Sequence, residues 1–101
     1  SKHAVTGMAR AFEAELGRHN IRVNSVHPGA VNTPMGSGSM RERIAETAAT
    51  NPRLASMTTP FLEKYMAEPE EVADMVAFLA SAESTFVTGQ HLGVDGGAQY
   101  F

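Results

Sequence analysis

The sequence contains no cysteine, which excludes disulfide bonds, thiolate metal ligands and a cysteine nucleophile. Any redox chemistry would therefore need a cofactor. Long apolar runs are also missing, because the longest, Met75–Ala80, is far shorter than the roughly 20 residues that cross a bilayer. The first residues lack the charged-then-apolar pattern of a signal peptide. Together these absences predict a soluble, cytoplasmic protein.

Basic charge is not concentrated anywhere in the chain. Eight Lys and Arg residues are scattered along it and are outnumbered by eleven Asp and Glu, which gives a formal net charge of −3. This balance argues against binding to nucleic acid or to anionic membranes. With 43% hydrophobic and 19% charged residues, the 101 residues have the composition of one small domain that buries a core. They are too few for a complete dinucleotide-binding α/β enzyme.

Hydrophobic periodicity predicts two helices. From residue 2 to about residue 17, apolar residues recur at i, i+3, i+4 and i+7, which is typical of an amphipathic helix that packs on one side. The second helix is predicted over about 69–82, where Pro69 suits the first helical position and Glu70 and Glu71 suit the positive end of the helix dipole. Shorter helical pieces are predicted over 40–49, on to residue 57, and around 61–66.

Two short strands are predicted, over 21–27 and 90–95, and each is followed by a glycine-containing turn. About sixty residues that include a good helix separate them, which indicates a parallel βαβ crossover with the helix on one face of the sheet. Asn24, inside the first strand, is expected to be a structural hydrogen-bonding residue. A two-stranded parallel sheet covered on one side is marginal by itself. The pattern therefore indicates the end of a larger α/β protein.

Four pieces of the sequence together resemble the C-terminal part of the short-chain dehydrogenase/reductase family. They are Ser1-Lys2 leading directly into an amphipathic helix, then Ile21-Arg22-Val23-Asn24-Ser25-Val26-His27-Pro28-Gly29, then Val31-Asn32-Thr33-Pro34, and finally Val87-Thr88-Gly89 running to Val94-Asp95-Gly96-Gly97. The run from Val26 to Met35 is most similar to members that act on terpenoid or steroid alcohols, including the carveol dehydrogenases of actinobacteria. The resemblance covers the chain except for roughly residues 37–66, where family members differ most.

The resemblance implies a Rossmann-type doubly wound parallel sheet, of which residues 1–101 would form one partial domain. The family's phosphate-binding glycine turn, catalytic serine and catalytic tyrosine would then precede Ser1, the tyrosine by three residues. Lys2 matches the catalytic lysine of the Tyr-x-x-x-Lys motif. In the family this lysine favours the phenolate of the tyrosine, whose pKa is otherwise near ~10, and donates to the nicotinamide ribose. A solvated lysine without such a role is the alternative interpretation.

The resemblance also assigns cofactor contacts to a second group of residues, namely Pro28, Gly29, Val31 and Thr33. Gly29 would let the backbone approach the nicotinamide closely, the backbone of Val31 would contact its carboxamide, and the hydroxyl of Thr33 would contact the carboxamide or a phosphate. Met35 is the candidate substrate-binding residue, and it begins a segment, 35–66, that closes over the substrate as a lid in the family. Ordinary turn, cap and packing roles remain the alternatives.

The implied function is that of a segment of an NAD- or NADP-dependent oxidoreductase, which interconverts a secondary alcohol and a ketone by hydride transfer. The substrate would be an apolar small molecule, and the full-length protein a homo-oligomer, either a dimer or a tetramer. No metal site is expected, since the four histidines lack ligand spacing and Asp95-Gly96-Gly97 offers one carboxylate, too few for a cation loop. The alternative is a catalytically inactive remnant or a small interaction module, because the 101 residues alone contain neither the phosphate turn nor the proton donor.

Overall fold

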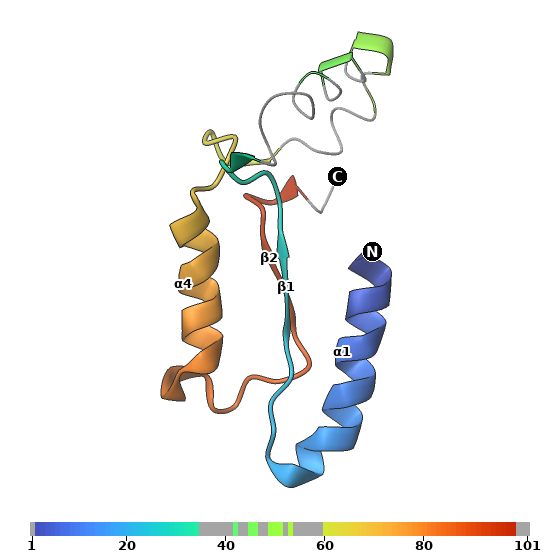
Figure 1. Ribbon diagram of the computed structural model, residues 1–101, viewed down its shortest axis with the longest axis vertical. Coiled ribbons are helices and arrows are strands. Elements are labelled where there is room, and N and C mark those ends of the chain that lie inside the picture. The colour runs from blue at the N-terminus through green and yellow to red at the C-terminus, as the bar shows by residue number, and fades with distance from the viewer. Residues whose placement is uncertain are drawn as a thin grey trace. The chain divides into compact units, whose positions relative to one another are not determined.

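The computed structural model describes residues 2–34, 42, 45–46, 49–51, 53 and 60–98. Its named elements are α1 (Lys2–Leu16), the 3₁₀ turn η1 (Gly17–His19), β1 (Ser25–Pro28), α4 (Pro69–Ala80), the 3₁₀ turn η3 (Ala82–Ser84) and β2 (His91–Val94) (Figure 1). Both predicted long helices are confirmed within two residues of their predicted ends. Of the predicted helix over 40–49, the described residues 42, 45, 46 and 49 are helical, as are 50 and 53 beyond it. The helical piece predicted around 61–66 is wrong, because these residues form bends and irregular backbone. No helix in these described ranges is long and apolar enough to cross a membrane.

The two strands form one parallel sheet. The N–H of Ser25 donates to the carbonyl of Gln90 at 2.9 Å, and the N–H of Gly29 donates to the carbonyl of Val94 at 3.0 Å. Because the bonded positions advance by four residues in both strands, β1 and β2 run in the same direction, as Figure 1 shows. The predicted α/β class with parallel strands is confirmed.

The first strand is shorter than predicted and begins later, at Ser25 instead of residue 21. Before Ser25, the N–H of Gly89 still donates to the carbonyl of Val23 at 2.8 Å, and side chains supply the other hydrogen bonds. The N–H of Val23 donates to the hydroxyl of Thr88, and the Asn24 amide donates to the carbonyl of Val87 while its oxygen accepts the N–H of Gln90, each at 3.0 Å. Asn24 is thus a structural hydrogen-bonding residue, as predicted.

The residues fall into two compact units, of which the first comprises Ser1–His27 and Ala73–Leu92. Residues alternate between the two faces of a strand, and the contacts follow that alternation. Ser25 faces α1, since its hydroxyl lies 2.9 Å from His91, whose ring in turn accepts from Arg10. Val26 faces the other way and lines a pocket with residues of α4. The two helices therefore cover opposite faces of the sheet in this unit, as Figure 1 shows, whereas the sequence predicted a helix on one face.

The apolar stripe of α1 is largely exposed. Val5 is 43% exposed, Met8 55% and Phe12 54%, whereas Ala9, at 7%, is the one buried hydrophobic residue of the described part. An amphipathic helix forms because its apolar face is covered in the folded protein. The stripe of Val5, Met8 and Phe12 is thus a surface without cover in this chain.

Local chemistry fixes both ends of α4. At its start, Pro69 takes the first helical position and the Glu71 carboxylate accepts the N–H of Glu68 at 2.7 Å, one half of a capping box. At its end, the guanidinium of Arg22 donates to the hydroxyl of Ser84 and to the carbonyl of Ser81, so a cation meets the negative end of the helix dipole.

Candidate functional site

The turn that follows β1 lies in the second unit, which comprises Pro28–Val72 and Gly93–Phe101. Gly29 pairs with the end of β2 through its N–H bond to Val94. A Cβ on Gly29 would lie 2.7 Å from the Cβ of Asp95 and 2.9 Å from its Cα, which is closer than real Cβ atoms come. The close approach of Asp95 therefore requires a glycine at this position, whether or not a ligand also does.

Asp95 belongs to a tight turn with two glycines. A carboxylate oxygen of Asp95 accepts the N–H of Gly97 at 2.9 Å. Gly96 and Gly97 have φ of 63° and 96°, which side-chain-bearing residues rarely adopt. The carbonyl of Gly96 accepts the N–H of Phe61 at 2.7 Å, and a Cβ on Gly97 would collide with the Phe61 ring. The segment that starts at residue 60 is thus seated on this turn.

The next residues form a short strand-like segment. Ala67 donates its N–H to Ala30 at 2.9 Å and accepts the N–H of Asn32 at 2.8 Å, which makes Val31 and Ala67 an isolated parallel bridge. In such a bridge the backbone groups of the central residue point to the opposite edge. The N–H and C=O of Val31 are therefore directed away from Ala67. Thr33 follows and is half-buried.

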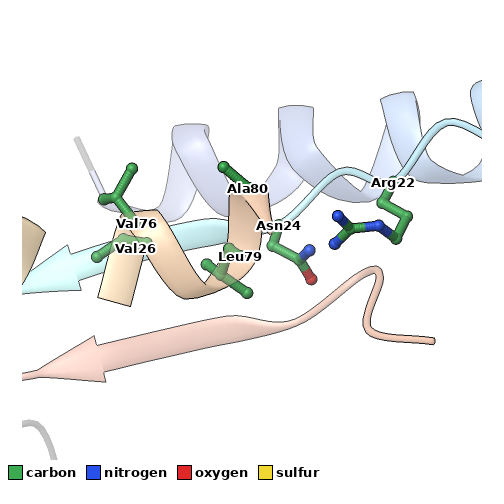
Figure 2. A pocket seen from close by; sticks show the side chains of 6 residues that line it. All are labelled: Arg22, Asn24, Val26, Val76, Leu79 and Ala80. Carbon is green, nitrogen blue, oxygen red and sulfur yellow. The ribbon is translucent and has the colours of Figure 1, made fainter. Parts of the chain in front are cut away.

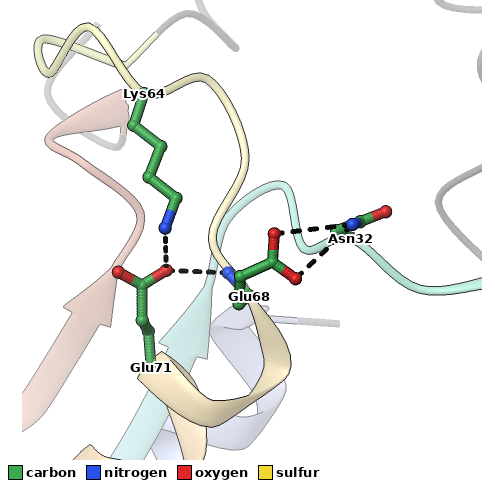
Figure 3. Close-up of polar contacts among 4 residues, drawn as sticks. All are labelled: Asn32, Lys64, Glu68 and Glu71. Carbon is green, nitrogen blue, oxygen red and sulfur yellow. Dashed lines mark hydrogen bonds and ion pairs between the residues drawn. The ribbon is translucent and has the colours of Figure 1, made fainter.

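A polar cluster joins this segment to the start of α4 (Figure 3). The amide of Asn32 lies 3.4 and 3.5 Å from the carboxylate oxygens of Glu68. Lys64 pairs with Glu71 at 2.8 Å. The hydrogen bond from Lys64 lowers the pKa of Glu71, with help from the Glu68 N–H, and the same bond raises the pKa of Lys64. The cluster holds residues 64–71 beside Asn32.

The structure brings four of the site residues predicted from the sequence onto one segment and leaves two apart from it or undescribed. Pro28, Gly29, Val31 and Thr33 lie on one continuous segment of the second unit. Lys2 opens α1 in the first unit, and its side chain is not among those described. Met35, the predicted substrate contact, lies outside the described residues, as does most of the segment 35–66.

A chain of hydrogen bonds that is exposed at Arg10 and buried at Ser25 and His27 runs along the sheet of the first unit. Arg10 donates from Nε to Nε2 of His91 at 3.3 Å, so the ring proton of His91 lies on Nδ1 and is donated to the Ser25 hydroxyl at 2.9 Å. That hydroxyl donates to Nε2 of His27 at 2.8 Å. Within the described ranges no group of three potential metal-ligating side chains occurs. The paired histidines are thus part of a structural network.

A pocket of about 350 Å³ lies between β1 and α4 in the first unit (Figure 2). Its apolar lining comes from Val26 and from residues of α4. Its two polar side chains are already engaged: Arg22 with Ser84 at 3.0 Å, and Asn24 with the carbonyl of Val87. We therefore place the candidate site on the turn after β1 and not in this pocket. The lining residues are Arg22, Asn24, Val26, Val76, Leu79 and Ala80.

Three residues that support the candidate site were not predicted to do so. Asp95 was noted in the sequence only as an insufficient cation ligand, while Ala67 and Glu68 carried no signal at all. Their roles arise from contacts across at least 35 residues of chain, such as Ala67 with Ala30 and Asn32. Only the glycines at 96 and 97, which mark a tight turn after a strand, pointed toward Asp95.

Comparison with known proteins gives a match along nearly the whole chain. Residues 1–99 match the family described as Enoyl-(Acyl carrier protein) reductase, and the chain therefore belongs to the short-chain dehydrogenase/reductase family of oxidoreductases. The predicted resemblance is confirmed.

Individual relatives show how much of such a protein the chain represents. A 3-oxoacyl-(acyl-carrier-protein) reductase of Thermotoga maritima is 43% identical over 97 residues, which are 96% of this chain and 35% of that protein. The crystal structure of a short chain dehydrogenase from Mycobacterium paratuberculosis bound to NAD is 57% identical with a TM-score of 0.89, over 98% of this chain and 36% of that one. Carveol dehydrogenase from Mycobacterium avium in complex with NAD is 33% identical with a TM-score of 0.79, over 98% of this chain and 38% of that one. The chain thus spans about a third of the length of these proteins and forms part of a Rossmann-type sheet.

Proposed function

We propose that this chain supplies the nicotinamide side of an NAD(P)-dependent oxidoreductase that interconverts a secondary alcohol and a ketone. Family membership supports this proposal, and so do the two similar structures that are described as holding NAD. The observation that carries it is the segment from Gly29 to Thr33. This segment leaves the carboxyl end of β1, the position where open α/β sheets bind their ligands.

The donors and acceptors of this segment fit a nicotinamide. A carboxamide presents one acceptor and one donor group, and the outward-pointing N–H and C=O of Val31 offer the complementary pair. Thr33 adds a hydroxyl that can donate or accept. When bound, the nicotinamide would take a hydride from the alcohol carbon or return it to the ketone. In this proposal Gly29, Val31 and Thr33 hold its ring in place, and Pro28 stiffens the turn.

Lys2 is proposed to act on the proton side of the reaction. Hydride transfer at the carbinol carbon requires a proton to leave or reach its oxygen. A tyrosine from outside residues 1–101 would carry that proton, as it does in the family, and the ammonium of Lys2 would favour its phenolate form. Lys2 would also donate to the ribose of the cofactor.

An apolar small molecule, such as a terpenoid or steroid alcohol, is the proposed substrate class. The similarity to a carveol dehydrogenase supports this choice. So does the described end of the segment 35–66, where Phe61, Leu62 and Tyr65 expose large hydrophobic side chains. Met35 is proposed as a substrate contact at the other end. We further propose that the full-length protein is a homo-oligomer, because the stripe of Val5, Met8 and Phe12 needs cover.

The test is turnover by the full-length protein that contains this sequence. We expect reduced nicotinamide to form from NAD⁺ or NADP⁺ with cyclic secondary alcohols, and Lys2→Met to lower kcat by ~10²-fold or more. Arg18→Met also replaces a cation by methionine, at an exposed residue that pairs with the exposed Glu15, and should leave kcat within about threefold of wild type. If the full-length protein binds neither cofactor, the inactive-remnant or interaction-module interpretation replaces the proposal.

A further inference from the structure

Asp95 is the residue that meets the candidate cofactor turn from the end of β2. Its Cα and Cβ occupy the space that a side chain on Gly29 would need. The N–H of Gly29 is bonded to Val94, the residue before Asp95. The position of the Gly29 backbone is therefore set jointly by the last strand hydrogen bond and by contact with Asp95.

The conformation of Asp95 is in turn fixed by its carboxylate. One carboxylate oxygen accepts the N–H of Gly97 at 2.9 Å, which closes a turn across two glycines with positive φ. Pro60 and Phe61 pack against these glycines so closely that a Cβ at either would lie 2.8 Å or less from them. A change in the backbone conformation of this turn would therefore displace residues 60 and 61.

We propose that Asp95 is a positioning residue for the cofactor turn. Its carboxylate locks the Asp95–Gly97 turn, the locked turn holds Gly29 at the end of β1, and Gly29 sets where Val31 and Thr33 begin. This inference rests on the proposed function, because it treats Gly29, Val31 and Thr33 as cofactor contacts. It gives the Asp-Gly-Gly end of the chain a role in cofactor affinity as well as in folding.

The experiment compares Asp95→Ala with Asp95→Asn in the full-length protein. Asn keeps an oxygen that accepts the Gly97 N–H, whereas Ala removes it. We expect Ala to raise the dissociation constant of NADH by ~3- to 10-fold, the equivalent of one lost hydrogen bond, and Asn to stay within about twofold of wild type. NADH binding is measured by its fluorescence, with NADPH in parallel, and hydrogen exchange of the Gly29 amide is measured in the same samples. Faster exchange in the Ala variant, restored by Asn, is expected.

The outcomes separate a positioning role from a purely structural one. Unchanged NADH affinity in Asp95→Ala, or equal losses in Ala and Asn, would overturn the inference. If Ala does not fold, Asp95→Glu is used in its place, because its carboxylate is one methylene too far to close the same turn, and wild-type NADH affinity in that variant would likewise overturn the inference. If the wild-type protein binds no nicotinamide cofactor, the proposed function fails, and the Gly29 exchange rates then decide whether Asp95 positions this turn at all.

Discussion

Gly29, in the turn after β1, is in direct contact with Asp95, in the turn after β2. The sequence interpretation gave this glycine one purpose, close approach to a nicotinamide. The structure adds a second, because Asp95 fills the space where a side chain would lie. The two requirements can be tested separately, because the packing against Asp95 affects the stability of the fold even when no cofactor is bound.

We therefore expect Gly29→Ala to destabilise the full-length protein without cofactor by about 1–3 kcal/mol, because the new methyl group overlaps Asp95. Gly7→Ala is the matched control: nothing lies within 4 Å of a Cβ there, and the position is inside α1. That variant should gain about 0.5–1 kcal/mol through helix propensity. Urea denaturation of both variants measures the difference, and a Gly29→Ala variant as stable as wild type would contradict the packing account.

At the scale of elements, the helices were predictable and the strand boundaries were not. α1 and α4 follow from local periodicity and from the Pro69 start, which do not depend on distant residues. The strand predicted over 21–27 begins only at Ser25, because the side chains of Thr88 and Asn24 take up backbone N–H groups that a regular ladder would pair with carbonyls. The placement of the candidate site after β1 stays a prediction from the sequence, whereas the contacts that Asp95 and Ala67 make with this segment had no local signal.

The start of α4 should show a pH dependence that follows from Lys64 and Glu71. The pKa of Glu71 lies below its ordinary 4.5, so its stabilisation is complete above pH 4.5 and is lost as the pH falls through the lower folded-state value. The pKa of Lys64 lies above 10.5, so its contribution is complete below pH 10.5 and is lost as the pH rises through the higher value. The pair therefore stabilises the helix start between these two limits.

Glu71→Gln should consequently reduce stability in the neutral range and have less effect in acid, where the wild-type carboxylate is itself protonated. Glu70→Gln removes the same charge from the same helical turn and serves as the control. Urea denaturation as a function of pH measures both variants. If the two variants lost stability in parallel at every pH, the Lys64–Glu71 bond would not be the cause.

For the whole molecule, two observations indicate that this chain is part of a larger protein: the apolar stripe of α1 is exposed, and the chain matches only about a third of each relative. Val5, Met8 and Phe12 form a surface that the full-length protein would cover in its proposed homo-oligomer. The sequence alone indicated this incompleteness from its two-stranded sheet.

The isolated 101-residue chain should accordingly have no dehydrogenase activity and should self-associate. We expect sedimentation velocity to show species larger than a monomer, and expect Met8→Glu with Phe12→Glu to reduce them, because charge on the stripe opposes apolar contact. Ala14→Glu adds a charge at an exposed position on the opposite side of the same helix and should change association less. A compact wild-type monomer at all concentrations, or alcohol oxidation by the isolated chain, would refute this expectation.

The bridge between Val31 and Ala67 also bears on how such a protein can be re-engineered. Because Asn32 and Ala67 are hydrogen-bonded to each other, the two ends of the segment between them are held side by side. The entropy of closing a loop grows only slowly with its length, so a change of length between Pro34 and Pro60 should cost little stability. The segment between these two prolines could therefore be exchanged for that of a relative, provided that Thr33 and residues 60–66 are kept, because Pro60 and Phe61 pack on the Asp95–Gly97 turn.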